Sequence, residues 1–427
     1  MSMHLTEEEK AMRDGRDGAA VAKAMDLLIR YGNARGAADF VETRNVCGTV
    51  TATTPFMRDF AMAKGGFDAV FSEFNLDTAD VVEVPQVRAK SFHLQLGFDP
   101  NHPKEMGVSE ETVQFYRRSE AVVARMGVNM INTCTPYQVG NVPAFGEHCA
   151  WMESSAVVYA NSVLGARTNT EGRESTSAAM LTCRIPRWGL HLDENRRGQV
   201  GVKIECTPQT NEDWGLLGYW MGHWVQNQVA VLDGVQHQPD LACLKHFGAA
   251  ASSSGGVELF HLVGVTPEAP SWAKAFGGNP EGEVRIYDAQ ARAQTLDKLN
   301  GQTQNTQVDY VMLGCPHYNL AQMQRALELL NGRRISAQSA LWLFTPHDIK
   351  SQADAQGLTV ALEQAGVKIL TNSCSAMSRA VPPGTRVVAL DSAKQAHYLP
   401  AILGVQAWFG TTAQCIDAAC TGVWSHA

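Results

Sequence analysis

The last third of the chain alternates short apolar runs with amphipathic stretches. The apolar runs of strand length are 308–313 (VDYVML), 340–344, 367–371 and 386–390. The stretches with helical spacing are 320–330, 348–364 and 392–403. Gly332 is placed to end the first of these helices. Strands that alternate with helices predict a parallel sheet covered on both faces, and therefore an α/β fold.

The N-terminal segment carries a signal for a helix start. Thr6 can accept a hydrogen bond from the backbone of Glu9, and the Glu9 carboxylate can bond back to Thr6, which is the pattern of a capping box. We expect a helix to begin here and a second helix to cover 19–30. The middle of the chain is rich in glycine, serine and other small residues, and its pattern does not define elements.

Length and composition bound the class of protein. The 427 residues are roughly three times the ~150 typical of one domain, so we expect lobes that cover approximately 1–210 and 211–427. Hydrophobic residues make up 45% and charged residues 18%, a globular mix. The net charge of −8 argues against a nucleic-acid partner. No apolar run approaches the ~20 residues that cross a bilayer, and the acidic N-terminus resembles no targeting signal, so we expect a soluble cytoplasmic protein.

Three of the ten cysteines follow apolar, strand-like runs. They are Cys134 after 128–133, Cys315 after the run that begins at 308, and Cys374 after the run that begins at 367. In parallel sheets, ligands bind at the carboxyl ends of strands. Soft thiolates select iron–sulfur clusters, zinc or Cu(I), and the absence of any CxxC pair excludes a zinc finger or ribbon. The alternative is that each cysteine is only a small buried hydrophobe. His317, beside Cys315, is either a ligand or, as we favour, a hydrogen-bonded core histidine.

Other polar residues also occupy positions suited to a site. Lys394 lies in the first turn of the helix predicted over 392–403, where a cation is unfavourable, and this indicates a role with an anionic ligand. Residues 45–51 are expected to form a loop that offers backbone donors. Residues 151–169 combine a carboxylate, hydroxyl groups and Arg167. The alternative for this stretch is a helix packed through Ala and Ser, with Arg167 in solvent.

Five strings carry a resemblance to a known family. They are Cys134-Thr-Pro-Tyr, 153–169 (ESSAVVYANSVLGARTN), 259–269 (LFHLVGVTPEA), Gly314-Cys-Pro-His and 391–398 (DSAKQAHY). These strings resemble the large subunit of aconitase X, and the likeness runs from the N-terminal helices to the C-terminal Thr421-Gly-Val-Trp. The string 153–169 is specific, whereas Cys-Pro-His alone is a weak signal.

The resemblance implies an aconitase-like α/β fold, with parallel-sheet α/β/α lobes around a cleft that holds an iron–sulfur cluster. The implied cluster ligands are Cys134, Cys315 and Cys374. The implied substrate-contacting positions are Gly48, Thr49, Val50, Asn75, Glu153, Ser154 and Lys394. The chain departs from the family where many relatives have Ser-Gly-Val-Ser (here 47–50, CGTV) and Asn-Pro (here 75–76, Asn-Leu). The family also uses a small swivelling domain, for which this chain has no obvious room, so we expect a separate small subunit as partner.

Dehydration of a β-hydroxy acid defines the roles expected of these residues. A base removes the proton α to the carboxylate, a Lewis acid with an open coordination position helps the hydroxyl to leave, and cations hold the carboxylate. Lys394 and Arg167 are the candidates for anion recognition. Glu153 and Ser154 are the candidates for proton transfer, and the sequence does not choose between them.

The family has two known substrates. We favour cis-3-hydroxy-L-proline, which gives Δ1-pyrroline-2-carboxylate, because of the departures at 47–50 and 75–76; the alternative is (R)-5-phosphomevalonate. Three other classes stay open: a zinc hydrolase built on Cys315 and His317, an enzyme with a cysteine nucleophile, and a non-catalytic or metal-binding subunit that needs a partner.

Overall fold

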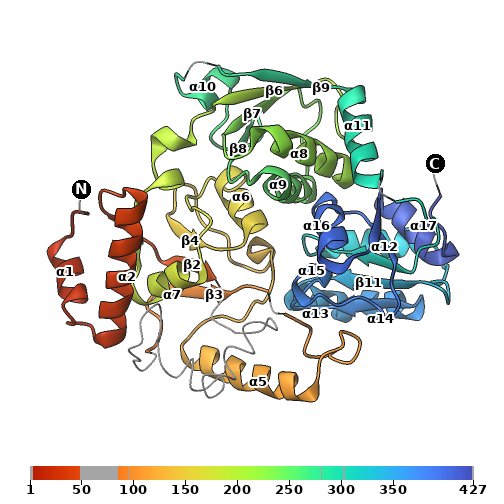
Figure 1. The fold of residues 1–427 in the computed structure, drawn as a ribbon, viewed down its shortest axis with the longest axis horizontal. Helices are drawn as coiled ribbons and strands as arrows, with labels where there is room; N and C mark the ends of the chain where they lie inside the picture. Colours follow the sequence, from red (N-terminus) through yellow and green to blue (C-terminus); the bar gives the residue numbers. More distant parts are fainter. Residues whose placement is uncertain (1–2, 49–84, 96, 280, 302, 426–427) are drawn as a thin grey trace.

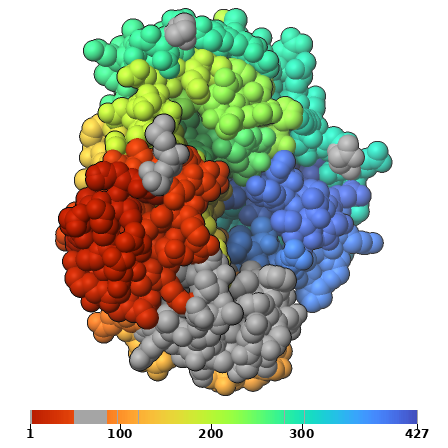
Figure 2. All heavy atoms as spheres, turned by 60° about the vertical axis from the view of Figure 1, so that its left-hand side comes forward, coloured from red at the N-terminus to blue at the C-terminus, as the bar shows by residue number. Residues whose placement is uncertain are grey.

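The computed structural model describes residues 3–48, 85–95, 97–279, 281–301 and 303–425. In this part of the chain the strands form four sheets of two, three, four and five strands (Figure 1). In the space-filling view the N-terminal segments, the four-stranded sheet with its helices and the C-terminal sheet meet around a hollow (Figure 2). Thr49, Val50 and Asn75 lie outside the described residues.

The five-stranded sheet confirms the strands predicted in the last third. Its order is β12-β11-β10-β13-β14, and every pair is parallel. The strands are β10 (Tyr310–Leu313), β11 (Ala340–Phe344), β12 (Val367–Leu370), β13 (Val387–Leu390) and β14 (Gln406–Phe409), of which the last is not predicted. Because the chain crosses from β12 back to the far side of β10, the strand order reverses between β10 and β13. Such a reversal is where open α/β sheets bind ligands.

Helices cover both faces of this sheet, as the pattern predicts. They are α11 (Ala289–Asn300), α12 (Leu320–Leu330), α13 (His347–Ala355), α14 (Leu358–Gln364), α15 (Ser375–Ser378), α16 (Ala393–Leu403) and α17 (Thr412–Thr421). Val311 packs with α12, α13, α14 and α17, whereas Met312 packs with α11 and α16 on the other face. The helix predicted over 348–364 is two helices, because Gly357 between them takes a left-handed conformation (φ +71°). Asn331 caps the C-terminus of α12 in the left-handed region, one residue before the predicted stop at Gly332.

The four-stranded sheet repeats this topology on a smaller scale. Its order is β8-β7-β6-β9, all parallel. Its elements are β6 (Val200–Ile204), α8 (Asn211–Val225), β7 (Ala230–Asp233), α9 (Leu241–Gly255), β8 (Phe260–Leu262), α10 (Trp272–Phe276) and β9 (Val284–Tyr287). The boundary expected near residue 210 falls between β6 and α8, and the division into two lobes stays a prediction.

Helices α8 and α9 lie backbone against backbone. A Cβ atom placed on Gly218 would lie 2.2 Å from the carbonyl oxygen of Phe247, and one placed on Gly255 would lie 1.7 Å from that of Gly222. Glycine is therefore required at these crossing points. Helix α16 packs against both α8 and α9, so this helix pair adjoins the C-terminal sheet.

The N-terminal part contains a three-stranded parallel sheet, β3-β2-β4, and an antiparallel pair, β1 with β5. The strands are β1 (Phe40–Glu42), β2 (Asn45–Gly48), β3 (Lys90–His93), β4 (Cys149–Trp151) and β5 (Arg184–Pro186). The helices are α1 (Glu7–Arg13), α2 (Ala19–Arg35), α5 (Glu110–Arg125), α6 (Ser154–Ser162) and α7 (Arg173–Thr182), with 3-10 turns η1 (Pro136–Gln138), η2 (Gly189–His191) and η3 (Asp193–Arg196). The capping box of Thr6 and Glu9 is present at α1, as predicted.

Two predictions for this part are wrong. Residues 45–48, expected in a loop, form the central strand β2, because β3 and β4 pair with it on both sides. Residues 128–133, expected as a strand, make only one bridge, between Asn129 and Phe92. The N–H of Asn132 still donates to the carbonyl of His93 in β3 (3.0 Å), but Asn132 takes a left-handed conformation (φ +48°) and no strand continues past it.

No helix among the described residues combines the length and the apolar character needed to span a membrane.

Candidate active site

Two thiols and a lysine lie at the carboxyl edge of the five-stranded sheet. Cys315 follows β10 by two residues, Cys374 is the N-cap of α15 after β12, and Lys394 lies in the first turn of α16 after β13. Gly314 makes the turn out of β10: its φ is +97°, and a Cβ atom there would lie 2.1 Å from a backbone oxygen of β11. The side-chain amide of Gln395 lies between the thiols, with Nε2 3.1 Å from the Sγ of Cys315 and 3.9 Å from that of Cys374. The reversal point of the sheet therefore gathers soft ligands and a cation.

The third thiol reaches this edge from the N-terminal part of the chain. The Sγ of Cys134 accepts a hydrogen bond from the backbone N–H of His317, at 3.5 Å. Cys134, Cys315 and Cys374 are each only 5–6% exposed. The structure thus brings together the three cysteines singled out by the sequence. Within the described residues, no three Cys, His, Asp or Glu side chains form a group that could hold a single metal ion.

Burial keeps these thiols protonated. It raises the pKa of Cys134 well above its usual value, and Glu153 and Cys315 raise it further. Burial also raises the pKa of Cys315 and, with Cys315 adding to the effect, that of Cys374 to about 12. Lys394 opposes this effect at all three thiols. Because thiolates are the ligand form, metal loading here would release protons.

A buried ion pair lies beside the thiols. Glu153 follows β4 and is the N-cap of α6: its Oε2 accepts hydrogen bonds from the N–H of Ala156 (2.7 Å) and the hydroxyl of Ser155 (2.6 Å). Its Oε1 accepts a hydrogen bond from the Nζ of Lys394 at 2.8 Å, and the side chains of Glu153 and Lys394 are only 17% and 14% exposed. The carboxylate therefore serves both as a helix cap and as the partner of a cation.

The pair holds both members in their charged forms. Burial raises the pKa of Glu153, but the charge of Lys394 and the hydrogen bonds from Lys394, Ser155 and Ala156 outweigh burial and hold that pKa below its usual value. Burial disfavours the ammonium of Lys394, yet Glu153 and the neighbouring thiols raise its pKa above the usual value. A charged carboxylate can accept a proton, and a charged ammonium can hold an anion.

The serine in contact with this pair is Ser155 rather than Ser154. The hydroxyl of Ser155 lies 3.3 Å from the Nζ of Lys394, in addition to its bond with Glu153. Ser154 is the first residue of α6 and is partly exposed. The Glu-Ser-Ser string contains the signal for both residues, but only the phase of the helix decides which hydroxyl turns toward Glu153.

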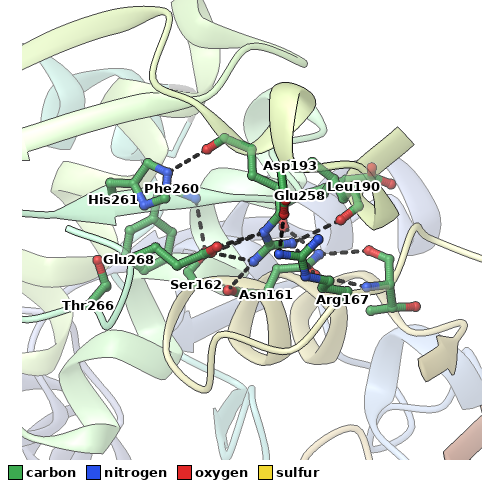
Figure 3. A network of polar contacts seen from close by, with 12 residues as sticks. Asn161, Ser162, Arg167, Leu190, Asp193, Glu258, Phe260, His261, Thr266 and Glu268 are labelled. Carbon is green, nitrogen blue, oxygen red and sulfur yellow. Dashed lines mark hydrogen bonds and ion pairs between the residues drawn. The ribbon is translucent and has the colours of Figure 1, made fainter. Parts of the chain in front are cut away.

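Gly48 and Arg167 occupy structural positions in the described residues. Gly48 ends β2, where its carbonyl accepts from the N–H of Leu94 (2.8 Å) and a Cβ atom would lie 2.3 Å from the hydroxyl of Thr176. Arg167 bonds Asp193 and the carbonyl of His191, within a polar network that joins the segment after α6 to the four-stranded sheet (Figure 3). Its side chain is 21% exposed, so it is not a solvent arginine. None of its hydrogen bonds reaches the thiols or the buried ion pair, and its role with substrate stays a prediction.

Comparisons with known proteins agree with this architecture. Family models match residues 2–194 (aconitase X first domain), 198–296 (second domain) and 308–421 (third domain). The chain is 34% identical to the phosphomevalonate dehydratase large subunit of Methanothermobacter thermautotrophicus, over 95% of this chain and 96% of that protein. The chain belongs to the aconitase X family. It is also 32% identical to the cis-3-hydroxy-L-proline dehydratase of Pseudomonas aeruginosa, over 97% of this chain and 69% of that protein.

A solved aconitase X shares the fold. The crystal structure of the Thermococcus kodakaraensis aconitase X in its holo form superposes with a TM-score of 0.81 at 28% identity, and the match covers 98% of this chain and all of that one. The expected aconitase-like α/β fold is confirmed. Because its relatives are dehydratases, this aconitase X is a hydro-lyase, and the class of enzyme expected from the resemblance is confirmed as well.

One buried residue of the aconitase X site is not foreseen from the sequence. Lys245, on α9, is 2% exposed, and its Nζ donates to the carbonyl of His317 (2.8 Å), the Oε1 of Gln322 (2.6 Å) and the Oε1 of Gln138 (3.3 Å). Burial lowers its pKa to about 8. Its three acceptors are 72 to 107 residues away along the chain, so no local pattern announces it.

Proposed function

We propose that this chain is the large subunit of an iron–sulfur-dependent dehydratase that converts cis-3-hydroxy-L-proline to Δ1-pyrroline-2-carboxylate. The dehydratase class follows from the family; the substrate, the cluster and the small partner subunit are the proposal. The observation that supports the substrate is the low positive charge of the site.

Few cations of the described residues are available to an anionic substrate. Lys394 is neutralised by Glu153, Lys245 points at neutral acceptors, and Arg167 is paired with Asp193. A phosphate group carries about two negative charges at neutral pH and is usually bound by several cations. A zwitterionic amino acid with one carboxylate and one ammonium suits a site made of one lysine and one glutamate.

The donor set fits an iron–sulfur cluster. Three buried thiols converge on one edge, and the amide of Gln395 lies within hydrogen-bonding reach of the Sγ of Cys315, where an N–H donor would stabilise a cluster-bound thiolate. A cluster contains several metal ions and sulfides, so its ligands lie farther apart than those of a single ion. With Cys134, Cys315 and Cys374 as ligands, such a cluster would supply Lewis acidity to the leaving hydroxyl.

The remaining chemistry falls to the buried pair. The Glu153 carboxylate, kept deprotonated by Lys394, is our candidate to accept the proton from Cα, with Ser154 as the second candidate. Two N–H bonds of the Lys394 ammonium point to Glu153 and Ser155 within the described residues, which leaves one for the substrate carboxylate. Ser155 fixes the other oxygen of Glu153, so the base has a defined orientation. Loss of the Cα proton and of the hydroxyl, which together leave as one water, gives an enamine, which tautomerises to the pyrroline.

A second substrate, (R)-5-phosphomevalonate, is favoured by one observation. The chain covers 96% of the Methanothermobacter large subunit but 69% of the Pseudomonas enzyme. The relatives that are named as large subunits, among them the Methanothermobacter protein, support our proposal of a separate small subunit.

Anaerobic reconstitution tests the proposal. The chain, co-expressed with a small aconitase X subunit and loaded with iron and sulfide, is expected to be brown and to turn over cis-3-hydroxy-L-proline. Cys315→Ser is expected to lose both iron and turnover, Glu153→Gln to lose turnover but keep iron, and Cys420→Ser, a partly exposed thiol on α17, to keep both. Turnover of phosphomevalonate alone would reverse the choice of substrate. A colourless chain that is active with zinc would overturn the cluster, and a fully active lone chain that does not associate would overturn the partner.

A further inference from the structure

His317 lies on the segment that carries Cys315 and bonds to the segments that carry the other two thiols. It lies two residues after Cys315 and is fully buried. Its backbone N–H donates to the Sγ of Cys134, and its ring nitrogens lie 2.8 Å from the hydroxyl of Thr133 (Nδ1) and 2.8 Å from the carbonyl oxygen of Ser373 (Nε2). Thr133 precedes Cys134, and Ser373 precedes Cys374. One residue of the first thiol segment therefore joins the segments that carry the other two.

The hydrogen bonds fix the state of the ring. A carbonyl oxygen only accepts, so the Nε2 atom that faces Ser373 carries the proton. The Nδ1 atom is then the acceptor for the hydroxyl of Thr133. A neutral imidazole with this one tautomer satisfies both contacts, and neither ring nitrogen faces the thiols as a ligand. The Nε2 of Gln95 also lies 3.1 Å from the Nε2 of His317, and in this tautomer a 180° rotation of the Gln95 amide places an acceptor oxygen there.

The far side of His317 is anchored as well. Its carbonyl accepts hydrogen bonds from the Nζ of Lys245 on α9 (2.8 Å) and from the Nε2 of Gln138 in η1 (3.0 Å). The contacts of this single residue join positions 183 and 56 residues away along the chain. A histidine that merely fills a core needs no ring partners such as Thr133 and Ser373, which precede two different thiols.

We propose that His317 is a positioning residue that holds the three thiol segments in register for the cluster. The inference rests on the proposed function and names the part of the chain that prepares the ligand set. Without the ring, the carbonyl of Ser373 loses its bond to Nε2, and the hydroxyl of Thr133 keeps, among the described residues, only its contacts with Thr135. The side-chain link of His317 to the segments that carry Cys134 and Cys374 is then lost. Groups that orient metal ligands are typically worth about 10- to 100-fold in metal affinity.

Three variants test the role. His317→Ala removes both ring contacts; His317→Gln can keep an N–H near Ser373, and His317→Asn can keep an amide near Thr133. His261→Ala is the matched control, because His261 is also a buried histidine bonded to a backbone carbonyl but lies in β8, without a contact to the thiol segments. The measurements are iron and sulfide per chain after anaerobic loading, the rate of iron loss to a chelator, and the electron paramagnetic resonance spectrum.

We expect His317→Ala to lose iron about tenfold faster or more, with a changed spectrum, while circular dichroism shows a native fold. His317→Gln and His317→Asn should fall between His317→Ala and the wild type, and His261→Ala should match the wild type. If His317→Ala does not fold, the Gln and Asn variants decide. Wild-type iron loss and spectra in these variants would overturn the inference.

An experiment on the metal-free chain tests the role of His317 independently of the proposed cluster. Mass spectrometry after timed alkylation reports the exposure of each thiol without any metal. His317→Ala should raise the alkylation rates of Cys134, Cys315 and Cys374 severalfold, and His261→Ala should not. A wild-type chain that takes up no iron would refute the proposed cluster, and the alkylation pattern would still decide whether His317 orders the thiols. Equal alkylation rates in wild type and His317→Ala would refute the positioning role.

Discussion

Removing either charge of the Lys394–Glu153 pair leaves the other buried without its partner. With Nζ and Oε1 2.8 Å apart, the Coulomb attraction at an effective dielectric constant of 20 is about 6 kcal/mol, much of which offsets the cost of taking two charges out of water. We therefore expect Lys394→Met and Glu153→Gln each to lower the free energy of unfolding by about 3–5 kcal/mol. The double variant should lose less than the sum, with a coupling free energy of about 2–3 kcal/mol.

The assay is a double-mutant cycle in urea with the metal-free chain. The matched control is the Lys350–Asp354 pair of α13, which has a similar N–O distance of 3.0 Å but lies at the surface. Its cycle should give about 0.3–0.5 kcal/mol, which should shrink further in salt, whereas the coupling of the buried pair should hardly change. Equal coupling in the two cycles, or a Lys394→Met variant as stable as Lys350→Met, would refute the argument from burial.

Three further changes have effects of definite sign. Burial raises the pKa of Glu171 to about 7, so between pH 4.5 and 7 this residue binds more protons in the folded than in the unfolded chain. Relative to Glu171→Gln, the wild type should therefore lose up to about 3 kcal/mol of unfolding free energy as the pH rises over this range. Melting temperatures measured against pH check this, with Glu174→Gln as the exposed control. Burial lowers the pKa of Lys245 to about 8, so the unfolded chain binds more protons at this residue between pH 8 and 10. The wild type should therefore gain stability relative to Lys245→Met as the pH rises from 8 to 10. A stability difference that does not change with pH would contradict the lowered pKa. Gly314→Ala should lose iron binding and at least about 2 kcal/mol of unfolding free energy, because its Cβ would collide with a backbone oxygen. Gly15→Ala has a similar φ of +93° but no neighbour within 4 Å, so it should cost only the backbone strain of about 1–2 kcal/mol and keep iron binding. Unfolding curves and iron content compare the two variants.

The sequence predicts the C-terminal sheet well because its elements are locally encoded. Strands β10 and β13 are apolar runs buried on both faces, and α12 begins and ends where its pattern predicts. The three thiols could be selected for the same reason, since the carboxyl ends of parallel strands share one edge. Strand β14 is missed because four residues that begin with an exposed glutamine give too short a pattern.

What the sequence does not predict depends on contacts between distant segments. Residues 45–48 read as a loop, yet partners at 90–93 and 149–151 pair with them and make them the centre of a sheet. The left-handed conformation of Asn132 ends an apolar run that any local pattern would extend. The acceptors of Lys245 come from two segments far from it in sequence, at Gln138 and at His317 and Gln322, so only the folded chain reveals this residue as a buried cation.

The glycine contacts between α8 and α9 affect the position of Lys394, through the helix that carries it. Helix α16, which begins one residue before Lys394, rests on both of these helices. A methyl group added at Gly218 or Gly255 cannot be absorbed by a side-chain rearrangement, because the opposing atoms belong to the backbone. The two helices would have to separate, and α16, which carries Lys394, packs against both of them, while α6, which Glu153 caps, packs against α9. Glycines remote from the thiols therefore support the packing on which both members of the Lys394–Glu153 ion pair rest.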